Sequence, residues 1–375
     1  MKIALDLRRI KNPGIGRYMR CLTEALLEVA PEHEYLLLLP PDGDGMIDGR
    51  GAHVEKISSS IKYYSVREQI EIPGILRRHK ADLLHSPHFN IPLMSPCPVV
   101  ATIHDVIYLA CPEDLPSRFG RLYYSGMMRA VVRMADHIIT VSQFSRSEIT
   151  QYLKTNRSVE VIYSGVESRF YPAGQDEIRA MRAKYKLTGE YILFTGIFKP
   201  RKNHSGLLKA FRRFVELGGK ATLAIAGPLA EGEPELRKLA EEIRIADRVV
   251  FTGFVDDFDL PALYSGASVY ACPSLYEGFG LTVLEAMACG VPVVSSSVAS
   301  LPEVAGTGAI YADARSPEAF GGALYQAFTD QDLRVSLISK GQKNAARFNW
   351  RNTAIQTLAV YEKAMAAQPG KAVYA

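Results

Sequence analysis

The chain has 375 residues, about twice the usual length of one domain, so two domains with separate cores are expected. Hydrophobic residues make up 47% of the chain and charged residues 22%, a balance that excludes an intrinsically disordered protein. The 44 basic and 40 acidic residues leave a formal charge of +4, which is too small for a dedicated nucleic-acid binder. No nucleic-acid partner is expected.

The cysteines and the N-terminal residues indicate the compartment. Five cysteines lie far apart, and none belongs to a C-x-x-C pair that would indicate a zinc or dithiol site. Residues 1–9 become charged too early for a signal peptide, and no run approaches the roughly 18 apolar residues of a membrane-spanning helix. We expect a cytoplasmic protein in a reducing compartment, without a bound metal.

Short apolar runs alternate with amphipathic stretches along the chain, which is the pattern of β-α units that build a parallel sheet. Helical periodicity appears in the first half at residues 17–29 and 117–134. The strands predicted there are 2–7, 35–39, 83–85, 99–103, 137–141 and 159–162. A second series of strands comprises 191–195, 222–226, 249–252, 269–271 and 291–295. Because the alternation starts again, two similar α/β domains are expected.

The segment 164–174 lacks periodicity and carries turn residues, so it is interpreted as the interdomain linker. The predicted domains are residues 1–167 and 168–349. A final amphipathic helix at 350–366 is expected to cross back to the first domain. Ligands of open α/β sheets bind at the carboxyl ends of the strands, and candidate residues are sought there.

The stretch 273–294 reads PSLYEGFGLTVLEAMACGVPVV and follows a predicted strand. Gly278 and Gly280 allow the backbone to approach a ligand, and the helix that follows offers free N–H groups to an anion. Glu277 stands before this helix and Glu285 about two turns into it, so both are expected to face a ligand. An ordinary strand–turn–helix connection with two solvated glutamates is the alternative.

Taken as a whole, this stretch resembles the retaining glycosyltransferases of family 4, which have the two-domain GT-B fold. It has a Glu, seven residues and a second Glu, with G-F-G after the first and E-A-M-A-x-G-x-P-V-V at the end. The resemblance implies that Glu277 contacts the donor sugar and that Glu285 hydrogen-bonds the nucleotide ribose. It further implies that the loop contacts the diphosphate or the sugar through Gly278, Phe279, Gly280 and Leu281.

The loop 195–203 reads TGIFKPRKN and follows the first strand of the second half. Fixed cations can stabilise the charge of a departing nucleoside diphosphate without a metal, and Arg201 and Lys202, at the start of a predicted helix, suit this task. A solvated turn is the alternative. Family 4 often has P-R-K here, and often an Arg directly after the glycine; this chain has Ile197 after Gly196, so Arg201 is expected to supply that charge.

In the first half, Gly14 and Gly16 precede a predicted helix, a position that suits a phosphate or a sugar. A Rossmann dinucleotide site is the competing interpretation, but Met19 stands where its third glycine is required. The resemblance implies that this loop lies on the donor or the acceptor side of the cleft expected between the two domains.

His104 and Asp105 lie at the end of a predicted strand. The resemblance implies that His104 touches the donor sugar near the reacting carbon. The segments 85–88 and 142–145 also resemble acceptor-facing loops of the family, and a purely structural role is equally open for them.

Phe254 and Val255 belong to a G-F-V segment that holds the nucleotide base through its backbone in the family, so their side chains do not identify the base. The P-R-K-N, H-S-P-H-F and T-I-H-D-V segments look most like mannosyltransferases that extend bacterial surface polysaccharides. The resemblance implies a GDP-mannose donor, a saccharide or lipid-linked saccharide acceptor, and no cofactor. A UDP-sugar donor, a nucleotide-sugar epimerase and a catalytically silent binding module are the alternatives.

Residues 116–135 contain apolar residues, four arginines and no acid. The arginines are Arg118, Arg121, Arg129 and Arg133. Such a basic amphipathic helix could rest on the anionic inner face of a membrane, and an ordinary helix packed on the sheet is equally compatible with the pattern.

Overall fold

The computed structural model describes residues 1–115, 117–228 and 232–366. The chain forms two compact units, which divide between Gly165 and Val166, two residues before the predicted boundary. The chain leaves the second unit after Phe348, and the final helix α14, Trp350–Ala366, belongs to the first unit. The bounds of this helix are the predicted ones.

Unit 1 contains a seven-stranded parallel sheet with the order β3-β2-β1-β4-β5-β6-β7. Its strands are β1 Lys2–Asp6, β2 Glu34–Leu39, β3 His53–Ser58, β4 Leu83–Ser86, β5 Val99–Thr102, β6 His137–Thr140 and β7 Val159–Val161. Besides α14, its helices are α1 Ile15–Val29, α2 Glu68–Arg78, α3 Ile107–Ala110, α4 Arg118–Met134 and α5 Gln143–Leu153, with short 3-10 turns at Asp44–Met46 and Pro112–Asp114.

Unit 2 contains a six-stranded parallel sheet with the order β10-β9-β8-β11-β12-β13. Its strands are β8 Tyr191–Thr195, β9 Thr222–Ala226, β10 Val249–Gly253, β11 Val269–Cys272, β12 Val293–Ser296 and β13 Ala309–Ala312. Its helices are α6 Gln175–Lys184, α7 His204–Glu216, α8 Glu233–Glu242, α9 Leu260–Ser265, α10 Leu281–Ala288, α11 Leu301–Ala305, α12 Pro317–Thr329 and α13 Gln331–Ala345. Three 3-10 turns lie at Pro200–Lys202, Ala246–Arg248 and Gly306–Gly308. The predicted α/β class with two Rossmann-like parallel sheets is confirmed.

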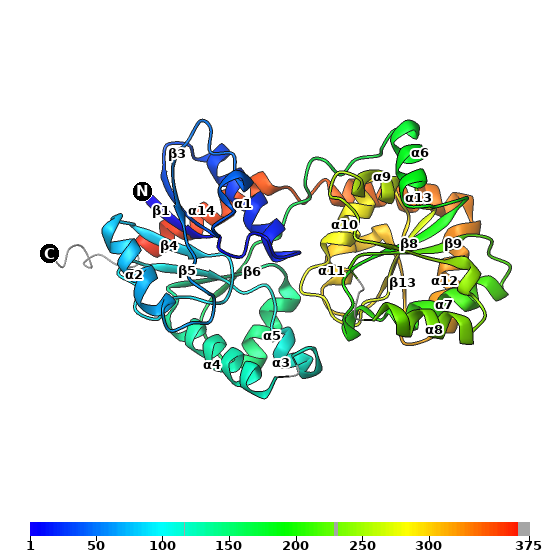
Figure 1. The fold of residues 1–375 in the computed structure, drawn as a ribbon, viewed down its shortest axis with the longest axis horizontal. Helices are drawn as coiled ribbons and strands as arrows, with labels where there is room; N and C mark the ends of the chain where they lie inside the picture. The colour runs from blue at the N-terminus through cyan, green and yellow to red at the C-terminus, as the bar shows by residue number, and fades with distance from the viewer. Residues whose placement is uncertain (116, 229–231, 367–375) are drawn as a thin grey trace. The chain divides into compact units, whose positions relative to one another are not determined.

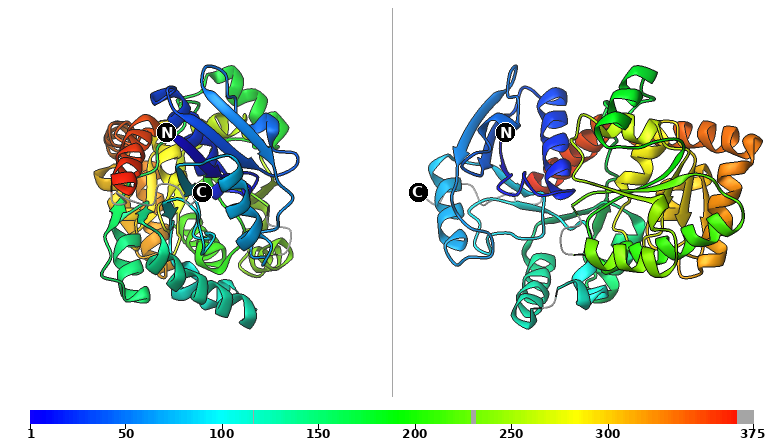
Figure 2. Two further views of the ribbon diagram at one scale, coloured as in Figure 1. Left: turned by 90° about the vertical axis from the view of Figure 1, so that its left-hand side faces the viewer. Right: turned by 45° about the vertical axis from the view of Figure 1, so that its right-hand side comes forward.

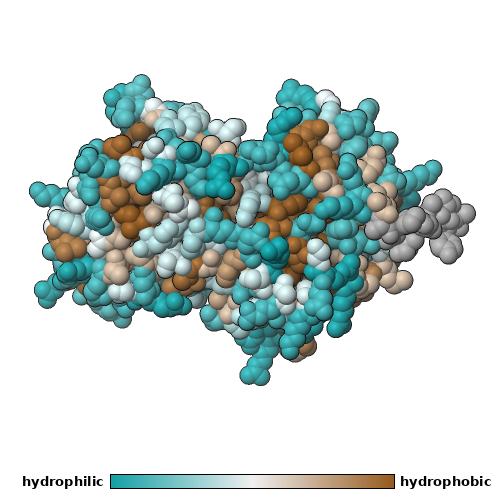
Figure 3. Space-filling view, turned by 180° about the vertical axis from the view of Figure 1, so that it is seen from behind, coloured by the Kyte–Doolittle hydropathy of each residue, from teal (hydrophilic) through white to brown (hydrophobic). Residues whose placement is uncertain are grey.

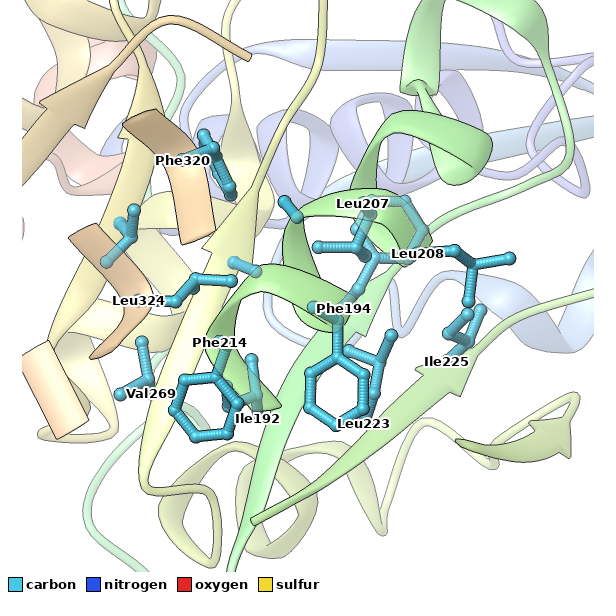
Figure 4. Packing of buried hydrophobic residues seen from close by; sticks show 14 of the residues in the cluster. Ile192, Phe194, Leu207, Leu208, Phe214, Leu223, Ile225, Val269, Phe320 and Leu324 are labelled. Atoms are coloured by element: carbon cyan, nitrogen blue, oxygen red, sulfur yellow. The ribbon is translucent and has the colours of Figure 1, made fainter. Parts of the chain in front are cut away.

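Each unit has its own hydrophobic core. In unit 2, apolar residues of α7 recur every three or four positions and bury one face of the helix against the sheet. Figure 4 shows side chains of α7, among them Leu207 and Phe214, beside Phe194 of β8 and Leu223 of β9. On the surface, Figure 3 shows hydrophobic residues in patches between hydrophilic ones. Within the described residues, no helix is both long and apolar enough to cross a bilayer.

The final helix completes unit 1. α14 packs on α1, and the two lie side by side in Figure 1 and in the right-hand view of Figure 2. His85 of β4 is fully buried, with Nδ1 2.6 Å from the Tyr361 hydroxyl of α14. The Thr353 hydroxyl donates to the carbonyl of Tyr163 at 2.7 Å. The segments where the chain leaves unit 1 and returns to it are therefore in direct contact.

Gly165 provides a test of this contact. A Cβ at this position would lie 2.3 Å from the backbone nitrogen of Trp350 and 2.6 Å from the carbonyl carbon of Asn349. Because backbone atoms cannot move aside as a flexible side chain does, Gly165→Ala should destabilise unit 1 by about 1–3 kcal/mol in urea unfolding followed by circular dichroism. Gly126→Ala is the matched control: it lies in α4 with open space around its Cβ and should gain about 0.5–1 kcal/mol. Equal stability of Gly165→Ala and wild type would contradict this packing.

Candidate functional site

The two candidate loops of unit 2 meet because their strands are neighbours. β8 and β11 pair directly, and their carboxyl ends lead into residues 196–203 and 273–280. The amide of Leu275 donates to the carbonyl of Arg201 at 2.7 Å, and the side-chain amide of Asn203 donates to the carbonyl of Pro273 at 3.3 Å. The sheet therefore joins residues 196–203, here called the basic loop, and residues 273–280, here called the Glu-Gly loop, into one surface.

At the centre of this surface, Lys202 and Glu277 form a half-buried ion pair. Lys202 Nζ lies 2.5 Å from Glu277 Oε1, and each side chain is 13% exposed. The Ser274 hydroxyl donates to the same oxygen at 2.7 Å. Burial opposes the ionisation of Glu277, but the charge of Lys202 and the hydrogen bonds from Lys202 and Ser274 outweigh it and hold the pKa of Glu277 below its ordinary value. Glu277 is therefore a carboxylate at neutral pH.

The glycine turn before α10 is held in one conformation. Gly280 has φ +107°, a value that L side chains rarely adopt. The Ser300 hydroxyl contacts two carbonyls of the turn, those of Glu277 at 2.9 Å and Phe279 at 2.8 Å. The first N–H groups of α10, from Leu281 on, have no acceptor within the helix. This turn presents backbone donors next to Lys202, an arrangement suited to an anion.

Glu285 lies deeper than Glu277. It is only 2% exposed and accepts a hydrogen bond from the Tyr264 hydroxyl at 2.9 Å. Tyr264 in turn lies 3.0 Å from the hydroxyl of Thr195 at the end of β8. Because α10 begins at Leu281, Glu285 stands in its second turn, facing the protein. The alternative of a solvated Glu285 is wrong.

The predicted helix start at Arg201 and Lys202 is also wrong. These residues form a 3-10 turn with Pro200, and α7 begins at His204. Asn203, at φ +56°, separates the two segments, and its side-chain amide donates to the carbonyl of Ala314 at 2.8 Å. The turn holds Lys202 beside Glu277 and Arg201 beside the Glu-Gly loop.

The other predicted donor residues of unit 2 lie at the ends of β8 and β10. The amide of Gly196 donates to the carbonyl of Ala226, and Gly227 packs so closely that a Cβ would meet the Gly196 carbonyl oxygen at 2.1 Å. Phe254 is 69% exposed, whereas Val255 is buried. The Phe254 ring is therefore open to solvent, whereas Gly196 and Gly227 join the ends of β8 and β9 in close contact.

Unit 1 carries the remaining predicted residues. Gly14 has φ +74°, and Gly16 is buried, where a Cβ would meet the Ile10 carbonyl oxygen at 2.1 Å. His104 Nε2 lies 3.0 Å from the Pro87 carbonyl, to which it donates. Burial lowers the pKa of His104 although Asp105 acts in the opposite direction, so the imidazole is neutral at pH 7.

In the segments 85–88 and 142–145, which were expected to face the acceptor, some side chains have a structural role. His85 is fully buried between Tyr361 and Thr102, and burial lowers its pKa to about 3. Ser142 caps α5 by accepting a hydrogen bond from the amide of Ser145 at 2.9 Å. His88 is buried, with Nε2 3.3 Å from Arg9 Nη1.

Sequence reasoning missed Ser274, Ser300 and Tyr264, the hydroxyl residues that position the two glutamates. Only Ser274, three residues before Glu277, lies inside the recognised stretch. Within residues 1–115, 117–228 and 232–366 there is no group of three His, Cys, Asp or Glu side chains that could hold a metal ion.

Comparisons with known proteins identify the family of the chain. Residues 13–170 match the family described as Glycosyltransferase Family 4, and residues 176–344 match Glycosyl transferases group 1. The O-antigen chain mannosyltransferase B of Escherichia coli is 33% identical over 96% of this chain and all of that protein. The serotype-specific mannosyltransferase WbdA of the same species is 30% identical over 94% of this chain, which spans about half (47%) of that protein.

Solved structures show the same fold at low sequence identity. Sucrose-phosphate synthase from Thermosynechococcus elongatus superposes with a TM-score of 0.78 at 22% identity, covering 98% of this chain and all of that chain. Anabaena HepE in complex with UDP-glucose gives 0.78 at 19% identity, covering 97% of this chain and all of that one. The fold is therefore GT-B. The two family models and the relative that matches nearly the whole chain show that the protein is a glycosyltransferase. The chain belongs to glycosyltransferase family 4, as its motifs predicted.

The Lys202–Glu277 pair predicts a pH dependence of stability. Because the folded-state pKa of Glu277 lies below its ordinary value of 4.5, the pair stabilises the fold above that pH and loses its effect as the pH falls through the folded-state pKa. Glu277→Gln should therefore lower the free energy of unfolding by about 1–3 kcal/mol near neutral pH, and this difference from wild type should narrow as the pH falls below 4.5.

Urea unfolding without ligand across this pH range measures the difference. Glu216→Gln is the control, since the ion pairs of Glu216 join side chains that are about 40% exposed and contribute little. A difference that stays constant or widens as the pH falls would contradict the assigned charge state of Glu277.

Proposed function

We propose that this enzyme transfers mannose from GDP-mannose, with retention of configuration, to a saccharide or lipid-linked saccharide acceptor. The observation that carries the proposal is the Lys202–Glu277 pair beside the glycine turn of α10. Two relatives that match nearly the whole chain are named mannosyltransferases, which supports mannose as the sugar. A UDP-hexose is the alternative donor, since Anabaena HepE was solved with UDP-glucose.

The cations of the basic loop suit the leaving group. In the proposal, Arg201 and Lys202 bind the diphosphate together with the amides of residues 278–281. Negative charge grows on the diphosphate as the glycosidic bond breaks, and cations fixed in a partly buried site stabilise that charge more than the ground state. No metal ion is required for this step.

The remaining residues are assigned to the sugar and the nucleoside. Once Lys202 turns to the diphosphate, the Glu277 carboxylate can accept hydrogen bonds from sugar hydroxyls. Glu285 is assigned to the ribose, Phe254 and Val255 to the base, and the Gly196 backbone to the phosphate side. In unit 1, we assign the loop that contains Gly14 and Gly16 to the donor. We also assign the neutral imidazole of His104 to the donor sugar, near the reacting carbon.

The proposed reaction needs no enzyme nucleophile. The acceptor hydroxyl oxygen forms a bond to the anomeric carbon as the bond from that carbon to the diphosphate oxygen breaks. The departing phosphate takes the acceptor proton on the same face, so the products are the mannoside and GDP. A double displacement would instead need a carboxylate that attacks this carbon, whereas in the proposal Glu277 is engaged by the sugar hydroxyls and by the Ser274 hydroxyl.

Helix α4 supports a position at the inner face of a membrane. Its buried residues, Tyr124, Met127, Met128, Val131 and Val132, pack into unit 1. Its other face exposes 86% of Phe119 and 72% of Leu122 beside Arg118 and Arg121. Exposed apolar side chains next to arginines suit a surface of anionic lipid, where lipid-linked acceptors are found.

Purified enzyme with labelled GDP-mannose and an α-linked mannotriose acceptor tests the transfer. Lys202→Ala should lower turnover by a factor of about 100 or more, because the leaving group loses a fixed cation. Lys209→Ala, which removes an exposed lysine of α7, should leave turnover unchanged. Released GDP and labelled product are quantified by chromatography, with and without EDTA, and EDTA should have no effect.

Near-normal turnover of Lys202→Ala would contradict the leaving-group assignment. Transfer from UDP-glucose but not from GDP-mannose would contradict the donor. A new sugar isomer formed from the donor alone would instead favour the epimerase.

Liposome co-sedimentation tests the membrane contact. Replacing Arg118, Arg121 and Arg129 by Gln should reduce binding to anionic vesicles roughly a hundredfold, since each basic residue near the surface contributes about 1 kcal/mol. The matched control replaces three exposed arginines of unit 2, Arg179, Arg237 and Arg244, by Gln. Unchanged binding of the α4 variant, or equal loss in both variants, would exclude α4 as the contact.

A further inference from the structure

Tyr64 of unit 1 has a backbone conformation that tyrosine rarely adopts. Its φ is +64°, in the left-handed region that disfavours side chains with a Cβ. The Tyr64 amide donates to Glu68 Oε1 at 3.0 Å, and its hydroxyl accepts a hydrogen bond from Arg9. The surroundings of Tyr64 therefore hold both its backbone and its side chain in place. Strained residues that are held in this way occur often at ligand-binding sites.

Glu68 holds several segments of unit 1 together beneath Tyr64. The Glu68 side chain is 1% exposed, and it accepts hydrogen bonds from Arg8 at 3.3 Å and from Asn90 at 2.7 Å. Arg8 also pairs with Asp6 at 2.7 Å, at the end of β1. Asn90, in the loop after β4, accepts a hydrogen bond from the Tyr123 hydroxyl of α4 at 2.9 Å. This network fixes Tyr64 and Tyr123 relative to the carboxyl ends of β1 and β4.

The surface above the network is aromatic and carries one cation. The Tyr64 ring stacks on Phe89 with centroids 6.0 Å apart, and it meets Tyr123 edge-on at 5.2 Å. Tyr64 is 42% exposed and Tyr123 37%. The Arg9 guanidinium lies 5.5 Å from the Tyr64 ring centroid, and its Nη1 is 3.3 Å from His88 Nε2. The exposed parts of Tyr64 and Tyr123 thus stand beside hydroxyl and guanidinium donors.

A sugar ring has matching chemistry, since its C–H face packs on aromatic rings while its hydroxyls meet N–H and O–H groups. The charges favour a neutral ligand over a phosphate, because Asp6 and Glu68 balance the two arginines, Arg8 and Arg9. We infer that Arg9, Tyr64 and Tyr123 form a subsite, here called the Tyr64 site, for the terminal hexopyranose of the acceptor saccharide. This inference rests on the proposed transfer reaction.

The Tyr64 site is connected to His104. The loop after β4 carries both His88, which borders the Tyr64 site, and Pro87, whose carbonyl accepts the hydrogen bond from His104 at 3.0 Å. His104 is the unit 1 residue assigned to the donor sugar. An acceptor ring on Tyr64 therefore lies next to the loop that positions His104, as an attacking hydroxyl requires.

Tyr64→Asn tests the site, because asparagine tolerates a positive φ and removes the ring without forcing a change in the turn. In this variant the KM for the acceptor, α-linked mannotriose, should rise about tenfold or more. The KM for GDP-mannose and the kcat at saturating mannotriose should stay within about twofold of wild type. Tyr64→Phe, which keeps the ring and loses only the Arg9 contact, should show a smaller rise. Tyr152→Asn, which removes a similarly exposed tyrosine of α5, should behave as wild type.

Saturation-transfer NMR of mannotriose with each variant gives a readout independent of catalysis: the signal should persist with wild type and Tyr152→Asn and fall strongly with Tyr64→Asn. An unchanged KM and NMR signal in Tyr64→Asn would overturn the inference. So would the absence of any mannotriose signal with wild-type enzyme at millimolar sugar. Failure of the proposed function looks different, because wild type would then neither transfer nor hydrolyse GDP-mannose whatever residue stands at position 64.

Discussion

The candidate site of unit 2 depends on the pairing of one half-buried carboxylate, Glu277, with one ammonium, Lys202. An unpaired charge at this depth would be costly, and Glu277 and Lys202 neutralise each other. The direct pairing of β8 with β11 makes this contact possible between residues 75 positions apart. Ser274, Ser300 and the left-handed Gly280 then fix the position of Glu277 and of the turn that follows it. In the proposed reaction, a diphosphate gives Lys202 a second anionic partner, and the sugar hydroxyls give Glu277 new hydrogen-bond donors.

Much of this fold could be predicted because parallel strands buried on both faces leave continuous apolar runs. β8, predicted over the same residues 191–195, is buried throughout. β3 was missed because charged and polar residues interrupt its apolar pattern, and β13 because it is a four-residue run whose side chains are only half-buried. The start of α7 was misplaced because Asn203 adopts a left-handed conformation that is fixed by a tertiary contact with the Ala314 carbonyl. No local pattern records that contact.

The site shows the same division between local and tertiary information. Glu277, Gly280 and Glu285 share one short stretch and were found by their spacing, and their assigned roles stay predictions. Tyr264 and Ser300 were not found, because they reach the glutamates and the turn only through the packing of α9 and the loop after β12. His85 and His104 look alike in sequence, yet one is enclosed between Tyr361 and Thr102 and the other borders the loop that carries His88. The Tyr64 site carries no motif at all.

The central claim, mannosyl transfer with retention, is tested most directly by the anomeric configuration of the first product. Wild-type enzyme is mixed with GDP-α-mannose and α-linked mannotriose, and the new linkage is read from the one-bond carbon–proton coupling of its anomeric carbon by NMR. A newly formed α-mannosidic bond with release of GDP is expected. A β-linked product, or no transfer from GDP-mannose by an enzyme that does use a UDP-hexose, would contradict it.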